Sequence, residues 1–485
     1  AAAVAVGMLM GAVQYLPVME YVPWSPRAGG KGYDYATSYA FPIEELLNTY
    51  IPEFTGILDK YWGRNGIHLH SEYLGVSVLI LAVLGFGAVK LASRRSFARF
   101  WLGVGIVTLL WALGGSTPFF HLIYALVPGT KFFRAPSTII YLVALAIAVF
   151  AALGTERVLA RDFTRKYVVG WSIFAGLLFL LGVCGGLTSM ANAIALPNRG
   201  AAPMPADNAG DLFIGSVRSF IAAAATLGVL LALLAGKLRS TTVAWLLTGI
   251  MALDLWSVER QYWMFSPPAS QLYASDAIIE QLKAIKEPGR VLAIPGYMLG
   301  LRPTGVTAPR DPYIELISNG LMVHGVRQLL GYHGNELGRY DVLTGREEDY
   351  KEILNPKLWN LLNVRYLLTD VDSFPIPGAS RIAGPVQNAA GSTEYLYRLP
   401  GENAFAWVAP VIVKAGDASV LATVLNARFD ATLAALVDSA APVVGPQITK
   451  LPPPTGIGVH TASYAAGHIA LELGKPAPEG SALVV

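Results

Sequence analysis

The sequence predicts a polytopic α-helical membrane domain followed by an extracytoplasmic mixed α/β domain. Seven apolar stretches fill the first half of the chain, and mean hydropathy is +0.47. Charged residues make up 14% of the chain, well below the roughly 25% of soluble domains. A soluble protein that buried seven such stretches would have almost no polar helix face. The third observation is that basic residues crowd alternate gaps between the stretches.

The predicted membrane domain covers residues 1–257. Several of its spans are shorter than the ~20 residues that a helix perpendicular to the membrane needs, so the predicted bounds hold only to within a few residues. The seven predicted spans are 1–18, 73–92, 100–115, 138–154, 168–188, 212–236 and 241–257.

The basic residues predict the orientation of the chain, because short loops rich in Lys and Arg stay on the cytoplasmic side. The pattern places the N-terminus of this chain in the cytoplasm. It places outer loops 19–72, 116–137 and 189–210, and everything after 257, on the other side. The crowded gaps hold Lys90, Arg94, Arg95 and Arg99, then Arg157, Arg161, Arg165 and Lys166, then Lys237 and Arg239. Of the outer gaps, 116–137 holds only Lys131 and Arg134, and 189–210 holds only Arg199.

Composition also argues against several classes of protein. The net charge is +3 with no basic stripe, which is not typical of a nucleic-acid partner. A single cysteine, Cys184, excludes an internal disulfide and a cysteine metal site, and we expect it to be a small core residue of the fifth span. The first stretch has no charged leader or small-residue cleavage site, so it is not a signal peptide. Both ends are abrupt, and we expect this chain to be part of a longer protein.

The outer loops carry their own local signals. Loop 19–72 is rich in Tyr and Trp, which favour the headgroup region. Within it, Pro42 followed by Glu44 and Glu45 predicts a short helix over 42–50. In the second outer loop, the apolar segment 119–126 is too short to span, so we expect it to dip into the interface and return.

The region after residue 257 divides into 258–390, an α/β domain, and 391–485, a strand-rich continuation. A helical face over 275–286, capped by Ser275 or Asp276, precedes a strand at 290–294. The same order recurs as a helix over 356–363 and a strand over 364–369, which favours a small α/β sheet. Further strands are predicted at 394–398, 404–413 and 468–473, with a helix at 417–426.

The sequence has no phosphate-binding glycine loop, GxSxG or HExxH motif. His68 and His70 fit either a strand-borne metal site or hydrogen-bonded loop histidines. A lipid phosphate handled at the outer surface would need cations and a carboxylate base. The outer loops supply Glu72, Glu45 and Asp34 as catalytic candidates and Arg134, Lys131 and His70 as lipid-phosphate candidates. Arg134 could equally anchor its helix at ordinary headgroups.

Two further groups of polar residues are candidates. Arg218 and Asp254 lie at similar depth in the sixth and seventh spans, where charges are costly unless paired, so we predict an ion pair or a shared polar pocket. In the outer domain, a glycine-punctuated region could bring its backbone close to a ligand or form a tight structural loop. Its candidates are His324, His333, Glu336, Arg339 and Tyr340.

Six motifs in a fixed order resemble the bacterial YfhO-like membrane proteins, which belong to or lie close to the GT-C superfamily of glycosyltransferases. The resemblance covers most of the chain. The motifs are Gln14-Tyr-Leu-Pro-Val-Met-Glu20, Tyr61-Trp-Gly63, His70-Ser-Glu-Tyr-Leu-Gly75, Pro128-Gly-Thr-Lys-Phe-Phe-Arg-Ala-Pro136, Gly331-Tyr-His333 and Leu362-Asn-Val-Arg-Tyr-Leu-Leu368.

The resemblance implies transfer of a sugar from a polyprenyl-phosphate donor to a cell-envelope acceptor. The reaction would take place on the outer face of the bacterial plasma (inner) membrane, with the C-terminal domain periplasmic or extracellular. The catalytic carboxylate of that family would lie upstream of Ala1, and its strand-rich end would lie after Val485. No cofactor is evident, and a divalent metal has no ligand set to support it.

The expected partners are membrane lipids, the polyprenyl-phosphate sugar donor and other membrane proteins, with no nucleic acid. A non-catalytic scaffold or accessory subunit of an envelope complex is the competing interpretation. A transporter is disfavoured, because matched halves with Gly/Pro-broken helices are not visible.

Overall fold

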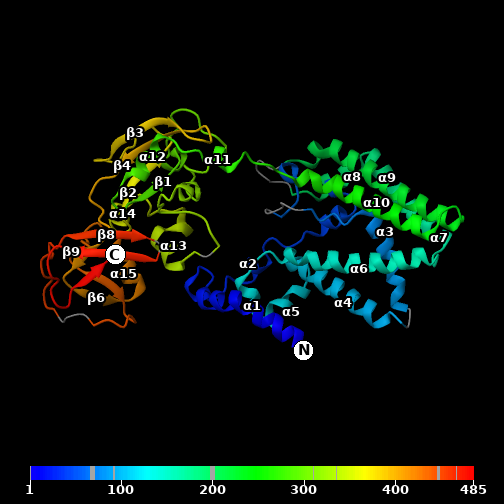
Figure 1. Ribbon diagram of the computed structural model, residues 1–485, viewed down its shortest axis with the longest axis horizontal. Coiled ribbons are helices and arrows are strands. Elements are labelled where there is room, and N and C mark those ends of the chain that lie inside the picture. Colours follow the sequence, from blue (N-terminus) through cyan, green and yellow to red (C-terminus); the bar gives the residue numbers. More distant parts are fainter. Residues whose placement is uncertain are drawn as a thin grey trace. The chain divides into compact units, whose positions relative to one another are not determined.

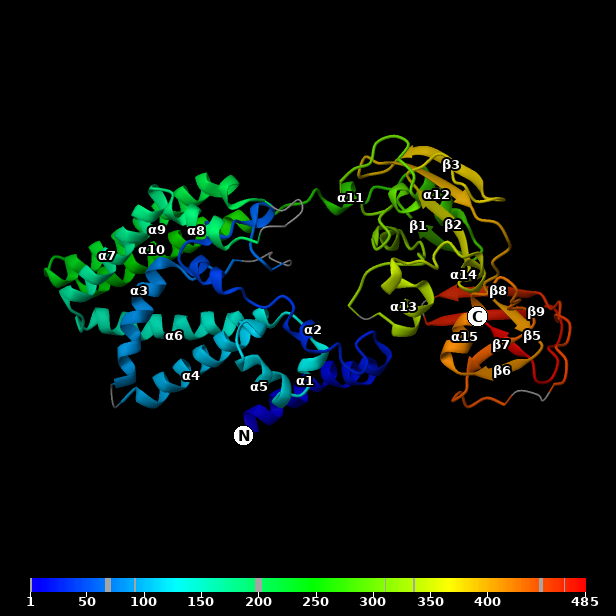
Figure 2. The same cartoon turned by 180° about the vertical axis from the view of Figure 1, so that it is seen from behind.

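The computed structural model describes residues 2–65, 71–90, 93–196, 203–309, 311–334, 336–444, 448–465 and 467–485. The chain divides into two compact units. A helical unit comprises residues 29–265, and a strand-containing unit comprises residues 1–28 together with 266–485. Figures 1 and 2 show the helices and strands of each unit.

All seven predicted apolar stretches contain helix. Within the described part of the chain, five segments are long and apolar enough to cross a membrane: 5–24, 136–159, 165–183, 205–234 and 240–262. The second stretch, 76–90, is shorter. The helices are α1 (Ala2–Tyr21), α3 (Val76–Gly85) continued by the 3₁₀ turn η5 (Phe86–Lys90), α4 (Arg95–Ala112), α6 (Ile140–Leu159), α7 (Arg165–Val183), α9 (Ala209–Leu234) and α10 (Ser240–Glu259).

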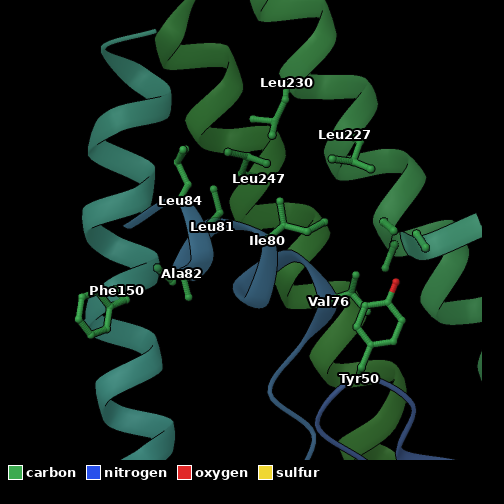
Figure 3. Packing of buried hydrophobic residues seen from close by; sticks show 14 of the residues in the cluster. Tyr50, Val76, Ile80, Leu81, Ala82, Leu84, Phe150, Leu227, Leu230 and Leu247 are labelled. Atoms are coloured by element: carbon green, nitrogen blue, oxygen red, sulfur yellow. The ribbon is translucent and has the colours of Figure 1, made fainter. Parts of the chain in front are cut away.

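Helix α3 provides much of the core of the helical unit. It is apolar on nearly all sides, which is typical of a helix enclosed by others. Ile80 and Leu81 are fully buried and lie among Phe150 of α6, Leu230 of α9 and Leu247 of α10 (Figure 3). Helix α4 packs along α6, and α7 packs along α9. Cys184, predicted to be a core residue, is exposed where α7 ends.

The predicted helix over 42–50 is a 3₁₀ helix, η2 (Ile43–Thr49), whose hydrogen bonds span three residues, as from Tyr50 N to Leu47 O. The segment 119–126, which the sequence marks as too short to span, forms a helix, α5 (Phe119–Leu126). The other short elements of this unit are α2 (Tyr33–Thr37), η3 (Pro52–Phe54), η4 (Leu58–Lys60), η6 (Gly114–Ser116), η7 (Thr130–Phe132), η8 (Pro136–Ile139), α8 (Gly186–Ile194), η9 (Pro205–Asn208) and η10 (Arg260–Tyr262).

The main sheet has the strand order β1-β2-β4-β3. Its strands are β1 (Arg290–Ala293), β2 (Val364–Thr369), β3 (Ser380–Gln387) and β4 (Thr393–Arg398). Strand β1 runs parallel to β2, and the other pairings are antiparallel. As predicted, helix α12 (Ala277–Ala284) precedes β1 and helix α14 (Pro356–Leu361) precedes β2. Asp276 caps α12 by accepting hydrogen bonds from Ile278 N and Ile279 N at 2.8 and 2.9 Å.

The boundary expected at 390 cuts through this sheet, because β4 pairs with β2 and β3. The strand predicted over 404–413 is two short strands, β5 (Trp407–Ala409) and β6 (Ile412–Ala415), and the predicted helix is α15 (Asp417–Val424). Pairs β10–β5, β6–β7 and β8–β9 complete this region. The remaining strands are β7 (Ala435–Asp438), β8 (Val459–Ala465), β9 (His468–Leu473) and β10 (Ala482–Val484).

Residues 1–28 group with the strand-containing unit, whereas the sequence places them in the membrane domain. The residues that contact the rest of this unit lie at the end of α1, in η1 (Val22–Trp24) and in the turn that follows η1. The Tyr21 hydroxyl donates to the carbonyl oxygen of Glu336, and Gly338 lies against the backbone of Ser25. The unit's remaining short elements are α11 (Ala269–Leu272), η11 (Gly296–Leu299), η12 (Gly320–His324), α13 (Gly338–Thr344) and η13 (Arg346–Glu348).

Candidate functional site

Residues 43–65 fold on themselves around side-chain hydrogen bonds, and residues 71–75 join them through a bond from Leu74 N to Thr49 O at 3.2 Å. Asn48 donates from Nδ2 to the Thr55 hydroxyl at 2.6 Å and accepts from Thr55 N at 3.2 Å. The Trp62 indole donates to Phe54 O at 2.8 Å. Trp62 and Phe54 are each 1% exposed, so this segment has a small core of its own. It is an ordered platform rather than an extended connector.

This platform buries two of the predicted catalytic candidates. Glu45 is 0% exposed and Glu72 is 6% exposed. Carboxylates are rarely buried unless they are paired or functional. The Tyr61 hydroxyl donates to Glu45 Oε1 and accepts from Asn65 N at 2.8 Å, so the ring is held between the carboxylate and the loop backbone. The arrangement gives Glu45 a fixed orientation.

Burial dominates the electrostatics of both carboxyl groups. The pKa of Glu45 is raised to about 7. Burial is the largest cause; the hydrogen bond from Tyr61 opposes it, and the charge of Glu44 adds to it. The pKa of Glu72 is raised to about 8. Burial is the largest cause and the charge of Glu45 adds to it, whereas hydrogen bonds from its own backbone and from Asn48 lower the pKa. Because burial disfavours ionisation of both carboxyl groups and the charge of Glu45 disfavours ionisation of Glu72, the pair can hold a proton near neutral pH.

A second buried network joins the platform to the apolar helices α9 and α10. Arg218 of α9 forms a two-pronged salt bridge with Glu53, with Nη2 to Oε2 at 2.8 Å. The Tyr73 hydroxyl donates to Asp254 Oδ1 at 2.5 Å, and Val76 N donates to Asp254 Oδ2 at 3.0 Å. The Arg218 guanidinium lies over the Tyr73 ring, 5.5 Å from its centroid. Arg218 and Asp254 therefore flank the same tyrosine, but the salt-bridge partner of Arg218 is Glu53.

The lipid-phosphate candidates lie in another part of the helical unit. Arg134 is exposed and lies over the Tyr39 and Tyr35 rings, 5.0 and 5.7 Å from their centroids. Lys131 is exposed, with its ammonium group 5.1 Å from the Phe132 ring centroid. Guanidinium stacked on aromatic rings keeps its donors free for an anion.

The structure does not bring all the predicted residues of the outer loops together. Asp34 is exposed in the first turn of α2, and no contact within the described ranges links it to Glu45 or Glu72. Glu44, beside Glu45 in the chain, pairs instead with Arg64 at 2.9 Å. His68 and His70 lie outside the described residues.

The candidates in the strand-containing unit have mostly structural contacts. Glu336 forms a salt bridge with Arg346, and Arg339 lies 2.6 Å from Asp438 and 3.0 Å from Asp417. The Tyr340 hydroxyl donates to Leu329 O at 2.5 Å. His333 is exposed, while His324 lines a groove and lies 3.3 Å from the Tyr313 hydroxyl. Only His324 of these five thus lines a groove identified in the described structure.

No group of three or more His, Cys, Asp and Glu side chains is arranged to hold a metal ion among the residues that the structure describes. A comparison of the chain with known protein families, curated proteins and solved structures finds no match. The chemistry of the site therefore has to be argued from its own residues.

The sequence did not identify Glu53 and Tyr73 as members of the buried network that contains Arg218 and Asp254. Glu53 lies three residues before the end of a Pro-Glu-Phe-Thr-Gly turn, and nothing in that local pattern distinguishes it from an ordinary surface acid. The one available signal was Arg218 itself, because an arginine inside an apolar span requires an acidic partner from elsewhere in the chain.

The raised pKa of Glu72 predicts a pH-dependent stability. The folded-state pKa of about 8 lies above the ordinary value of 4.5, so the folded chain binds this proton more tightly than the unfolded chain. Stability is then present at low pH and is lost as pH rises from about 4.5 through about 8. A tenfold difference in proton affinity between the two states corresponds to about 1.4 kcal/mol of folding free energy.

We expect Glu72→Gln to flatten this dependence, because the amide stays neutral. The measurement is the unfolding temperature of the detergent-solubilised protein between pH 5 and pH 9. Asp59→Asn, at an exposed position of the same segment, should keep the slope of the unmodified protein. Parallel curves for Glu72→Gln and the unmodified protein would contradict the assignment.

Proposed function

We propose that this chain is a membrane glycosyltransferase-like protein of the bacterial plasma membrane. It would transfer a sugar from a polyprenyl-phosphate donor to a cell-envelope acceptor on the outer face. The observation that carries the proposal is the buried pair Glu45 and Glu72, in a segment joined to the apolar helices. The alternate basic gaps support the orientation, with loop 19–72 and residues 266–485 outside.

The chemistry needs a base for the acceptor and a stabilised leaving group. A carboxylate of the Glu45–Glu72 pair would take the proton of the acceptor hydroxyl. The acceptor oxygen would then form a bond to the anomeric carbon, while the bond from that carbon to the phosphate oxygen breaks. A pKa near the working pH is suited to such proton transfer. The lipid phosphate that departs would be stabilised by cations. Arg134 and Lys131 are exposed cations of the same unit, although no contact among the described residues links them to the Glu45–Glu72 pair.

The test is sugar transfer by membranes that contain the full chain, supplied with a polyprenyl-phosphate-linked radiolabelled sugar. We expect Glu72→Gln or Glu45→Gln to lower the rate about a hundredfold, the lower end of the usual contribution of acid–base catalysis. The matched control is Asp59→Asn, which changes an exposed carboxylate of the same platform. Full transfer by both glutamine variants, with unchanged unfolding temperature at pH 6, would disprove the assigned role.

The alternative is a non-catalytic scaffold or accessory subunit of an envelope complex. The observation that favours it is the Glu53–Arg218 and Tyr73–Asp254 network, which satisfies its charges within the chain and fixes the platform to the helices. In that case neither glutamine variant would change sugar transfer in these membranes, because the unmodified chain itself would add nothing to the background rate.

A further inference from the structure

The end of α1 and the turn after η1 lie against the start of α13. The Tyr21 hydroxyl donates to the carbonyl oxygen of Glu336. A Cβ at Gly338 would lie 3.1 Å from the carbonyl oxygen of Ser25, so the missing side chain lets α13 begin in contact with this turn. Leu337 stands between these two contacts and therefore lies beside the end of α1. All of these residues belong to the strand-containing unit.

The end of α1 also marks a level in the membrane. The segment 5–24 is long and apolar enough to cross a membrane, and none of its residues is buried. Met19, near the end of this segment, is 70% exposed. A spanning helix ends where the hydrocarbon core gives way to the headgroups, and aromatic side chains such as Trp24 collect at that level. A surface that touches this end of α1 therefore lies at the level of the headgroups too.

The surface beside η1 is apolar and exposed. Trp24 is 57% exposed, Leu337 53% and Val342 59%, and we call these three residues the apolar patch. Val342 lies about one turn of α13 after Gly338, in the part of the helix that begins against η1. Exposed apolar side chains that gather in this way mark a surface that contacts a partner or a membrane.

The charged side chains next to the apolar patch are paired with one another. Arg346 forms salt bridges with Glu336 and with Asp341. None of the three side chains is more than 27% exposed. Contact of the patch with lipid would therefore not take an unpaired charge of Glu336 or Asp341 out of water, which would be costly.

We propose that the apolar patch rests on the lipid bilayer at the headgroup level and seats the strand-containing unit on the membrane beside α1. Leu337 and Val342 would enter the boundary between headgroups and acyl chains, as the apolar face of an interfacial helix does. The indole of Trp24 would keep its N–H among polar headgroup atoms. The proposal needs α1 to span the membrane. It depends neither on which side the unit lies nor on sugar transfer.

The experiment measures contact with lipid by fluorescence quenching on the full chain in phosphatidylcholine nanodiscs. The single cysteine is replaced by Cys184→Ser, and an environment-sensitive fluorophore is attached after Leu337→Cys or Val342→Cys. The quenchers are a phosphatidylcholine spin-labelled near the headgroup and aqueous iodide. The matched controls are Met19→Cys on α1 and Ile382→Cys, which is exposed on β3. Strand β3 lies at the opposite end of this unit from α13 (Figure 1).

We expect the spin-labelled lipid to quench the probe at 337 and 342 at least half as strongly as at 19, and severalfold more strongly than at 382. Iodide should show the reverse order. Quenching at 337 and 342 by iodide alone, as at 382, would overturn the proposal. Protection of both positions from both quenchers would also overturn it, because a protein and not lipid would then cover the patch. Absence of lipid quenching at 19 would remove its basis, since α1 would not span.

Discussion

Glu53→Gln is expected to destabilise the folded chain by about 3–5 kcal/mol, the usual cost of removing one partner from a buried salt bridge. The variant leaves the guanidinium of Arg218 in α9 without its carboxylate, and the Arg218 side chain is only 18% exposed. Gly215 makes the pairing possible, because a Cβ at that position would overlap the Glu53 carboxylate. The expected result is a large drop in the unfolding temperature of the detergent-solubilised protein.

Two further variants isolate the buried pair. Glu53→Gln combined with Arg218→Met removes both charges, and we expect it to recover much of the loss, since no unpaired charge remains. The control is Lys60→Gln. Lys60 pairs with Asp211 at 2.6 Å and joins the same platform to the same helix, but its side chain is 54% exposed, so its loss should cost less than about 1 kcal/mol. Equal losses in Glu53→Gln and Lys60→Gln would contradict our account.

Gly154→Ala is expected to cost about 3 kcal/mol or more and to lower the yield of folded protein. Helices α3 and α6 approach so closely that a Cβ at Gly154 would overlap Leu81 O, and a Cβ at Gly85 would overlap Phe150 O. Small residues allow membrane helices to pack backbone against backbone. One added methyl group would force the two helices apart along a fully buried contact, and overpacking of this kind is costly.

The measurement is the yield of monodisperse protein in detergent together with its unfolding temperature. Gly176→Ala in α7 and Gly228→Ala in α9 are matched controls, because a Cβ at either position would meet no atom within 4 Å. Both controls should fold as the unmodified protein does. A Gly154→Ala variant with unchanged yield and unfolding temperature would show that α3 and α6 can separate at no cost.

The elements of this chain were predictable where the signal is local. Ser275 to Lys286 carries an apolar face, a cap and a following glycine, and the helix and strand appear there as expected. Strand β3 was not predicted. Its residues alternate weakly, and it is held by pairing with β4 rather than by its own pattern. The 3₁₀ form of η2 was also missed, because Pro42 and the two acids mark where a helix starts and not which hydrogen bonds it makes.

The candidate site was predictable only in its parts. The sequence marked Glu45 and Glu72 as carboxylates of an outer loop and Arg218 as a costly charge within a span. It could not show that the first two would share a buried platform or that the third would pair with Glu53. These contacts join residues up to 165 positions apart, and no periodicity or spacing encodes them.

Hydropathy, which depends on how each short segment partitions between water and lipid, was enough to predict a chain of apolar helices. The local order of helix and strand patterns was enough to predict a mixed α/β region after them. Whether a polar side chain is buried, paired or free depends on which distant segments pack against it. Only the tertiary structure therefore decided that Glu45 and Glu72 lie together out of water, that Glu53 neutralises Arg218, and that Tyr21 donates to the backbone of Glu336.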